Sequence, residues 1–204
     1  MGFYSEQLVP RGVNVMLGNS MFAKVRSEAC GGLHGDVIEL GFGSGLNMPH
    51  LPPEVTGVWT VEPSAVAMKL AAKRMAASPI EVHQGALDGE RLDFPDTRFD
   101  SALSTMTLCT IPDVDGALTE LRRVLKSRAD FHFAEHGLAP DEKVVRMQGR
   151  MNGFQQRVAG GCHLNRDIAA LITKAGFEIE TIRNFYLKGP KAWGYMYVGR
   201  ARTP

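Results

Sequence analysis

The chain alternates short apolar runs with stretches in which apolar side chains recur every three or four residues. The first pattern is typical of buried strands, and the second is typical of helices that pack one face on a core. Strands are predicted at 36–40, 55–61, 80–83, 99–104, 129–135, 178–184 and 195–200. Helices are predicted at 64–77, 114–125 and 166–175, and Gly176 is expected to end the last of them.

Strands that alternate with helices predict an α/β fold. We expect a seven-stranded, mostly parallel sheet with helices on both faces. The last two strands are expected to form an antiparallel hairpin at the edge of this sheet. No internal repeat and no linker rich in proline, glycine or serine interrupts the chain, so residues 1–204 are expected to form a single domain.

The segment before the first strand has a different pattern. Val13, Leu17, Met21 and Val25 recur at intervals of four, which predicts a helical lead-in over residues 1–33. Glycines at the end of this segment stop the pattern.

Composition excludes several classes of protein. The 23 basic and 22 acidic residues nearly cancel, which gives no electrostatic reason to expect nucleic acid or an anionic membrane as partner. The three cysteines, Cys30, Cys109 and Cys162, are far apart and suit a reduced, cytoplasmic protein. No secretion signal is visible, and no apolar run reaches the ~18–20 residues that span a bilayer.

A glycine-rich turn follows the first predicted strand and carries the strongest chemical signal. It reads Glu39-Leu-Gly41-Phe-Gly43-Ser-Gly45 and opens the ligand-binding edge of an α/β sheet. Gly41 allows a sharp turn, and Gly43 and Gly45 leave room for a cofactor to lie against the backbone. The G-x-G-x-G spacing differs from the G-x-G-x-x-G of dinucleotide sites. A carboxylate at Glu39 suits an ammonium group better than a pyrophosphate.

An acidic residue ends the second predicted strand. Glu62 follows Gly41 at the distance where a carboxylate accepts hydrogen bonds from ribose hydroxyls. This role is common to several nucleotide cofactors, so it does not distinguish among them. The alternative is an ordinary helix start at 62–64, since acidic residues and serine are favoured there.

Six motifs in order carry a resemblance to a known family. ELGFGSG, VEP, LDGERLDFPD, RFDSALSTMTLCTIPD, ELRRVLK and FAEHG together resemble the class I S-adenosylmethionine-dependent methyltransferases. The similarity is greatest to the ubiquinone- and menaquinone-biosynthesis-like group and to the small-molecule thiol methyltransferases. It runs from about residue 36 to 137 and implies a Rossmann-like fold. One departure is Lys-Ser-Arg-Ala at 126–129, where the family often has Lys-Pro-Gly-Gly.

The resemblance implies S-adenosyl-L-methionine as the cofactor and a role for each matching residue. The glycine turn with Glu39 would hold the methionine part, and Glu62 the ribose. Pro63 would pack beside the adenine, Asp88 would bond its amino group, and Thr105 would face the sulfonium. The cofactor-binding residues predicted in this way are Glu39, Gly41, Gly43, Gly45, Glu62, Pro63, Asp88 and Thr105.

The methyl acceptor is expected at the same edge of the sheet. His136 ends the fifth predicted strand and titrates near neutral pH, so it is the candidate catalytic base or acceptor-orienting group. Residues 138–165 are interpreted as a lid on the acceptor side.

Three further residues are candidates for the acceptor pocket. Cys162 and His163 resemble a segment near the pocket of thiol-methylating relatives, although the same segment also suits a loop in which Asn165 caps the next helix. Tyr4, with Phe3, resembles an aromatic pair that folds over the cofactor. No metal site is expected, because Cys162 and His163 are only two adjacent ligands.

We therefore expect an enzyme that methylates a small molecule, such as a thiol or a phenol. Two alternatives remain open. A methyltransferase-fold binding module without activity is the first, and a nicotinamide-dependent oxidoreductase is the second. The turn spacing and Glu39 speak against the second.

Overall fold

The computed structural model describes residues 4–204, and its strands form one sheet. The strands are β1 (Gly35–Leu40), β2 (Val55–Val61), β3 (Glu81–Gln84), β4 (Phe99–Thr105), β5 (Leu125–His136), β6 (Glu178–Tyr186) and β7 (Tyr195–Arg202). The helical segments are η1 (Tyr4–Leu8, a π-helix), α1 (Val9–Leu17), α2 (Ser20–Cys30), η2 (Met48–His50, a 3₁₀ turn), α3 (Ala65–Ala76), α4 (Val114–Val124), α5 (Glu142–Val158), α6 (Ile168–Lys174) and α7 (Lys191–Gly194).

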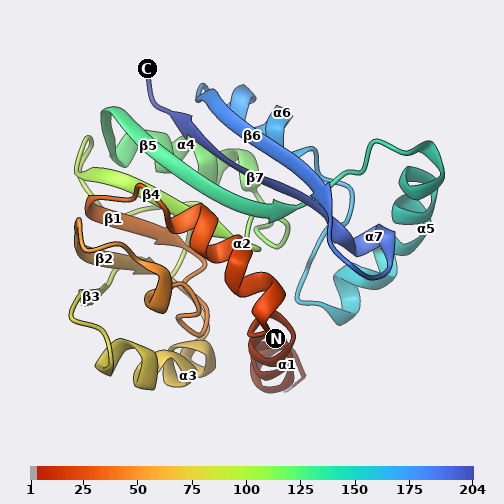
Figure 1. Ribbon diagram of the computed structural model, residues 1–204, viewed down its shortest axis with the longest axis horizontal. Helices are drawn as coiled ribbons and strands as arrows, with labels where there is room; N and C mark the ends of the chain where they lie inside the picture. The colour runs from red at the N-terminus through yellow and green to blue at the C-terminus, as the bar shows by residue number, and fades with distance from the viewer. Residues whose placement is uncertain (1–3) are drawn as a thin grey trace.

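The strand order across the sheet is β3-β2-β1-β4-β5-β7-β6 (Figure 1). β1 to β5 run parallel, whereas β7 pairs antiparallel with both β5 and β6. The predicted seven-stranded, mostly parallel sheet with an antiparallel edge hairpin is therefore confirmed.

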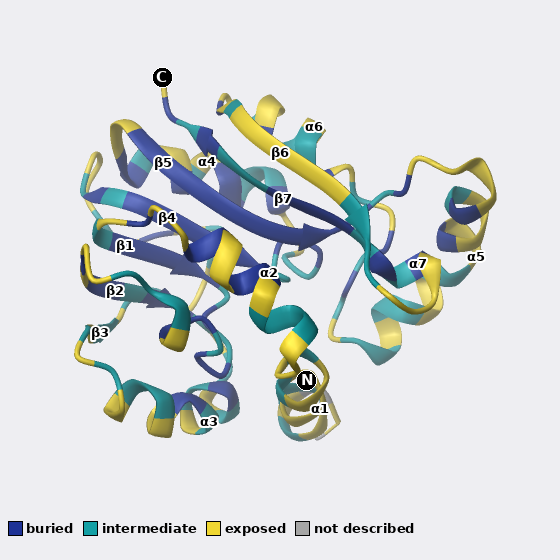
Figure 2. Ribbon diagram, viewed as in Figure 1, coloured by how far each residue is buried: buried dark blue, intermediate teal, exposed yellow. Residues whose placement is uncertain are grey.

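Two apolar clusters cover the two faces of the sheet. Val37 and Ile38 are neighbours on β1 but belong to different clusters, because successive side chains of a strand point to opposite faces. One cluster packs α2 and α3 on the sheet, and the other packs α4 and α6 on it. β1, β4 and β5 are buried from both sides, as Figure 2 shows. Burial on both faces is typical of parallel strands that helices cover from both sides, and here it includes polar side chains such as Ser101, Glu135 and His136.

The helix starts depend on short polar side chains. Ser64 Oγ accepts a hydrogen bond from the backbone N–H of Ala67 and so caps α3. α6 begins two residues later than expected, because Asp167 caps it through the N–H of Ala170. The alternative in which Asn165 caps this helix is therefore wrong. Gly176, at φ +87°, ends α6 as predicted.

The lead-in is helical, but it is not one helix. The chain breaks at Gly18, and Asn19 caps α2 by accepting hydrogen bonds from the N–H groups of Met21 and Phe22. α1 has no buried residue, and Val13 is 42% exposed. The apolar spacing of four therefore describes two helices, of which only α2 packs into the core through residues such as Val25.

β5 starts at Leu125, directly after α4 and four residues before the predicted boundary. Arg128 has φ +59°, a left-handed conformation in the segment where the family often has glycine. The chain there is held by Thr203, whose hydroxyl donates to the carbonyl of Lys126 and accepts from the N–H of Ala129. These bonds to the end of β7 replace a glycine turn.

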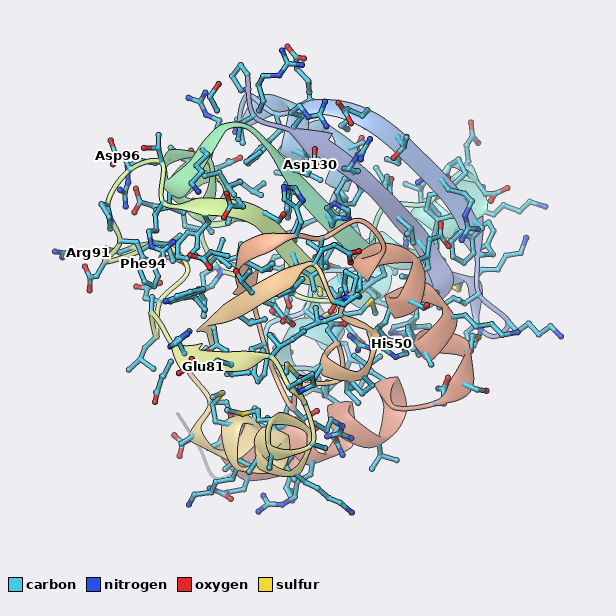
Figure 3. All side chains as sticks on the ribbon, turned by 60° about the vertical axis from the view of Figure 1, so that its left-hand side comes forward. His50, Glu81, Arg91, Phe94, Asp96 and Asp130 are labelled. Carbon is cyan, nitrogen blue, oxygen red and sulfur yellow. The ribbon has the colours of Figure 1, made fainter. Side chains whose placement is uncertain are left out.

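Ion pairs fix the register between β5 and β7. Asp130 lies opposite Arg202, and its Oδ1 accepts hydrogen bonds from Arg202 Nε and Nη2 at 3.0 and 2.9 Å. Figure 3 labels Asp130, which belongs to β5. Arg202 also pairs with Glu180 on β6, so one guanidinium links three neighbouring strands.

Candidate active site

The carboxyl ends of the parallel strands β1, β2, β4 and β5 lie at one edge of the sheet. This edge is where α/β sheets bind ligands, because the loops after neighbouring strands separate there. Most of the residues predicted to be functional come from these four strand ends.

The glycine turn after β1 needs its glycines. Gly41, Gly43 and Gly45 have φ of 69°, 57° and 70°, which is left-handed backbone. Gly41 is also in close contact with the loop after β4: a Cβ on Gly41 would lie 2.1 Å from Thr107 Oγ1. A Cβ on Gly43 would meet only the carbonyl oxygen of Gly41, at 3.8 Å. The turn is therefore packed from behind at Gly41 and open at Gly43.

The carboxylate of Glu62 holds this turn from the end of β2. Its Oε2 accepts a hydrogen bond from the N–H of Gly43 at 2.7 Å, and its Oε1 accepts one from the N–H of Ser64 at 2.8 Å. Burial raises the pKa of Glu62, and the two backbone hydrogen bonds oppose that shift. Glu62 is thus fixed between the glycine turn and the start of α3.

Glu39 is fully buried at the end of β1. Its Oε1 accepts a hydrogen bond from Asn47 Nδ2 at 2.6 Å, and its Oε2 has no partner among the described residues. Burial raises the pKa of Glu39 to about 8, although Asn47 and the charge of Arg26 act in the opposite direction.

A polar network connects Glu39 to the end of β4. Thr105 Oγ1 accepts hydrogen bonds from Arg26 Nη1 at 2.8 Å and from Asn47 Nδ2 at 2.9 Å. Arg26 Nη1 also donates to Asn47 Oδ1 at 2.8 Å. Thr105 is 6% exposed, and its hydroxyl is already engaged in these two hydrogen bonds.

Arg26 and Asn47 were missed by sequence reasoning. Arg26 is only 6% exposed, and Asn47 only 2%. The signal for Asn47 was its place directly after the glycine turn. Arg26 gave no such signal, because it follows Val25 by one residue and so lies about 100° around the helix from the apolar stripe.

Two predicted cofactor residues lie on the surface at this edge. Pro63 is exposed at the start of α3. Asp88 is exposed in the loop after β3, where its Oδ1 accepts a hydrogen bond from the N–H of Glu90 at 2.8 Å. Among the hydrogen bonds of the described residues, none joins Pro63 or Asp88 to the network around Glu39.

His136 lies at the end of β5 and is 5% exposed. Its Nε2 is 3.1 Å from Cys162 Sγ, and its Nδ1 has no partner among the described residues. Burial acts to lower the pKa of His136, but the hydrogen bond and charge of Cys162, with the charge of Glu135, raise it overall. A hydrogen bond with Cys109 and the contact with His136 lower the pKa of Cys162. The structure thus brings His136 and Cys162 together, a contact that could not be predicted from the sequence.

Glu135 precedes His136 and is fully buried. Its carboxylate accepts hydrogen bonds from Ser104 Oγ at 2.7 Å and from the N–H of Thr107 at 2.9 and 3.0 Å. Burial raises the pKa of Glu135 to about 7. Glu135 therefore fixes the loop after β4 against the end of β5, although sequence reasoning singled out only its neighbour.

The remaining acceptor-side candidates lie between the amino-terminal segment and α5. Tyr4 is 51% exposed, and its hydroxyl donates to the carbonyl of Val158 at the end of α5, at 2.8 Å. His163 is half-buried, with its Nδ1 3.1 Å from Gln156 Nε2 on α5. The contact predicted for Phe3 lies outside the described residues. Tyr4 thereby joins the segment before α1 to the predicted lid.

Comparison with known proteins gives a family match over the central part of the chain. Residues 38–133 match the family model described as "Methyltransferase domain". A thiol S-methyltransferase, TMT1B of Rattus norvegicus, is 29% identical over 146 residues, which cover 70% of this chain and 59% of that protein. A phosphatidylethanolamine N-methyltransferase of Cereibacter sphaeroides is 27% identical over 105 residues, which cover 50% of this chain and 51% of that protein. The chain thus spans little more than half the length of these relatives.

The fold is also similar to solved structures. A protein of Thermotoga maritima, described as a SAM-dependent methyltransferase and possible histamine N-methyltransferase, has a TM-score of 0.67 and 19% identity. The match covers 99% of this chain and 98% of that one. Within the described residues, no helix has the length and apolar character that crossing a membrane requires.

Proposed function

The chain carries a methyltransferase domain of the class I, S-adenosylmethionine-dependent family, and from this premise we propose that it methylates a small molecule, with a thiol as acceptor. The observation that carries this proposal is the glycine turn with Glu39 and Glu62 at the carboxyl edge of the sheet. The similarity to TMT1B of Rattus norvegicus, which is named a thiol S-methyltransferase, supports the choice of a thiol as acceptor.

The residues at the turn fit the cofactor. Glu39 has one buried carboxylate oxygen without a partner, and the ammonium of the methionine part is a donor that can satisfy it. Each oxygen of Glu62 accepts only one hydrogen bond and has a lone pair left for a ribose hydroxyl. The open space beside Gly43 leaves the backbone accessible. The roles of Pro63 and Asp88 beside the adenine stay predictions.

When bound, S-adenosyl-L-methionine supplies a methyl carbon that its positive sulfonium activates. The protein has to position the acceptor in line with that carbon and to remove the acceptor proton. His136, at the end of β5, is the group proposed for this task, because it is buried beside the loop after β4. Tyr4, His163 and the lid at 138–165 are proposed to enclose the acceptor from the other side.

A thermal-shift titration tests the cofactor, with S-adenosylhomocysteine as ligand and NAD as control. A ligand that binds only the native state raises the melting temperature. We expect a shift with S-adenosylhomocysteine and none with NAD. A labelled-methyl screen of thiols, phenols and amines then identifies the acceptor, and transfer to amines alone would contradict the thiol proposal.

The variant Glu62→Ala is expected to bind S-adenosylhomocysteine more weakly by about 1–3 kcal/mol, the scale of losing hydrogen bonds to a charged group. This corresponds to an increase in Kd of about 5- to 150-fold. Titration calorimetry measures it. Glu54→Gln, at an exposed position outside the turn, is the control and should bind normally. Wild-type affinity in the Glu62 variant would remove the ribose assignment.

The variant His136→Gln is expected to lower kcat by about 10²–10⁴-fold, the usual contribution of a positioned acid–base group. The Kd for S-adenosylhomocysteine should stay close to the wild-type value, because His136 lies apart from the glycine turn. Steady-state kinetics with the identified acceptor and calorimetry with the cofactor product measure the two effects separately. Unchanged turnover would exclude His136 from the mechanism.

A further inference from the structure

Three soft metal ligands from separate segments meet beside the proposed acceptor site. Cys109 comes from the loop after β4, His136 from the end of β5, and Cys162 from the segment after α5. One ligand atom of each lies within 4.8 Å of the others, and all three residues are buried. In the sequence only Cys162 and His163 stand together, and two adjacent ligands are too few to predict a metal site.

The backbone holds this cluster in place. The N–H of His163 donates to the carbonyl of Cys109 at 2.8 Å, so the two cysteine segments are bonded directly to each other. The guanidinium of Arg166 donates to the carbonyl of Leu108. Gly160 and Gly161, at φ 61° and 87°, turn the chain after α5 and bring Cys162 to this position. The arrangement therefore exists before any ligand binds.

The geometry is close to that of a tetrahedral zinc site. Zinc binds sulfur at about 2.3 Å and histidine nitrogen at about 2.0–2.1 Å, which places the ligand atoms about 3.5–3.8 Å apart. Here His136 Nε2 and Cys162 Sγ are 3.1 Å apart, and the whole set lies within 4.8 Å. Shifts of about an ångström would complete the site.

Charge and ligand type favour the same ion. Two thiolates balance the charge of Zn²⁺, so the loaded cluster is neutral and can be buried at little electrostatic cost. Thiolate and imidazole ligands in a tetrahedral arrangement select zinc over magnesium or calcium. Three protein ligands leave a fourth position open, which is the pattern of catalytic rather than structural zinc.

We propose that Cys109, His136 and Cys162 bind one Zn²⁺, whose fourth position takes the sulfur of the acceptor thiol. The role of the fourth position rests on the proposed function, whereas the zinc site does not. A thiol bound to zinc loses its proton to solvent and becomes the nucleophile. A lone pair of this sulfur then forms the bond to the methyl carbon while the bond from that carbon to the sulfonium sulfur breaks. The electron pair of the broken bond stays on the departing thioether. The oxidation state of zinc does not change, and His136 promotes the loss of the acceptor proton as a ligand of the metal.

Metal binding is tested on the purified chain, reduced and without cofactor. We expect one Zn²⁺ per chain in a competition titration, and a thiolate-to-metal charge-transfer band with Co²⁺. The variants Cys109→Ser, Cys162→Ser and His136→Gln should each weaken binding more than about tenfold, since each removes one ligand. Cys30→Ser is the matched control, because Cys30 is equally buried but belongs to α2, and it should bind as the wild type does.

Thiol counting makes the negative results decisive. The proposal would be overturned if a reduced sample with added Zn²⁺ bound no metal while all three of its thiols could be titrated. Wild-type binding in the Cys109 or Cys162 variant would also overturn it. If only one thiol titrates under non-reducing conditions and no reduced sample binds metal, the two cysteines form a disulfide pair and the zinc site is refuted.

Turnover with and without a chelator separates this inference from the proposed function. We expect chelation to abolish methyl transfer to a thiol and added Zn²⁺ to restore it. If zinc binds but its removal leaves turnover unchanged, the role of the fourth position fails while the methyltransferase function stands. If zinc binds and no thiol is methylated in any state, the proposed acceptor fails while the metal site stands.

Discussion

Replacing Gly41 by alanine is expected to destabilise the protein by about 2–4 kcal/mol, through left-handed backbone strain together with overpacking. Gly41 has φ +69°, and the new Cβ would lie 2.1 Å from Thr107 Oγ1 and 2.3 Å from Thr107 Cγ2. Thr107 cannot easily move away, because Glu135 accepts a hydrogen bond from its N–H. The strain therefore has to move the glycine turn, and binding of S-adenosylhomocysteine should weaken as well.

Urea unfolding of Gly41→Ala gives the free energy of unfolding, and calorimetry gives the Kd for S-adenosylhomocysteine. Gly149→Ala is the matched control. Gly149 is exposed inside α5, and a Cβ there would meet nothing within 4 Å. The same substitution should stabilise the protein at that position by about 0.5–1 kcal/mol, since alanine favours a helix over glycine. Equal effects at the two positions would contradict the packing described for the glycine turn.

Replacing Glu39 by glutamine is expected to remove most of the pH dependence of cofactor binding. The pKa of Glu39 is raised to about 8 by burial, so the carboxyl is mostly protonated at pH 6–7 in the free protein. An ammonium group binds the carboxylate form, and binding must therefore release this proton. Affinity for S-adenosylhomocysteine should rise by up to about tenfold per pH unit below pH 8, and the contribution of Glu39 should level off above it. The ligand's own ammonium also titrates near this range.

The comparison of wild type with Glu39→Gln isolates the contribution of Glu39, because the titration of the ligand is common to both. Without ligand, the free energy of unfolding should change with pH in the opposite direction: it should fall as pH rises. A carboxyl whose folded pKa exceeds the unfolded value of about 4.3 contributes stability that is present below that value and is lost as pH rises toward 8. Calorimetry and urea unfolding at several pH values measure both effects. Parallel pH profiles in the two proteins would exclude Glu39 from cofactor binding.

The sheet and the glycine turn could be predicted because local sequence dictates them. Buried strands such as β1 have apolar runs, and the turn after β1 needs glycine at Gly41 for its left-handed backbone. The helix boundaries that were predicted wrongly depend on competition between similar residues. Asn165 and Asp167 are both good cap residues, and the structure selects Asp167. The break at Gly18 was hidden, because the apolar spacing of four continues across it.

The rest of the candidate site could not be predicted because its contacts are long-range. His136 and Cys162 are 26 positions apart, and the distance between them depends on how the chain returns from α5. Arg26 bonds with Thr105, 79 positions away. A single basic residue in an amphipathic helix gives no sign of such a partner. The sequence therefore identified the residues at the strand ends, and the fold shows which of them meet.

The position of β7 has a consequence for the order in which the chain folds during synthesis. β7 is made after the other strands of this sheet, yet it lies inside the sheet between β5 and β6. Until it has been made, β5 presents an unpaired edge whose backbone N–H and C=O groups can pair with other chains. Protein synthesis adds only about 5–20 residues per second, so nascent chains are exposed to this risk for several seconds. We expect chains stalled before β7 to need a chaperone that the finished protein does not need.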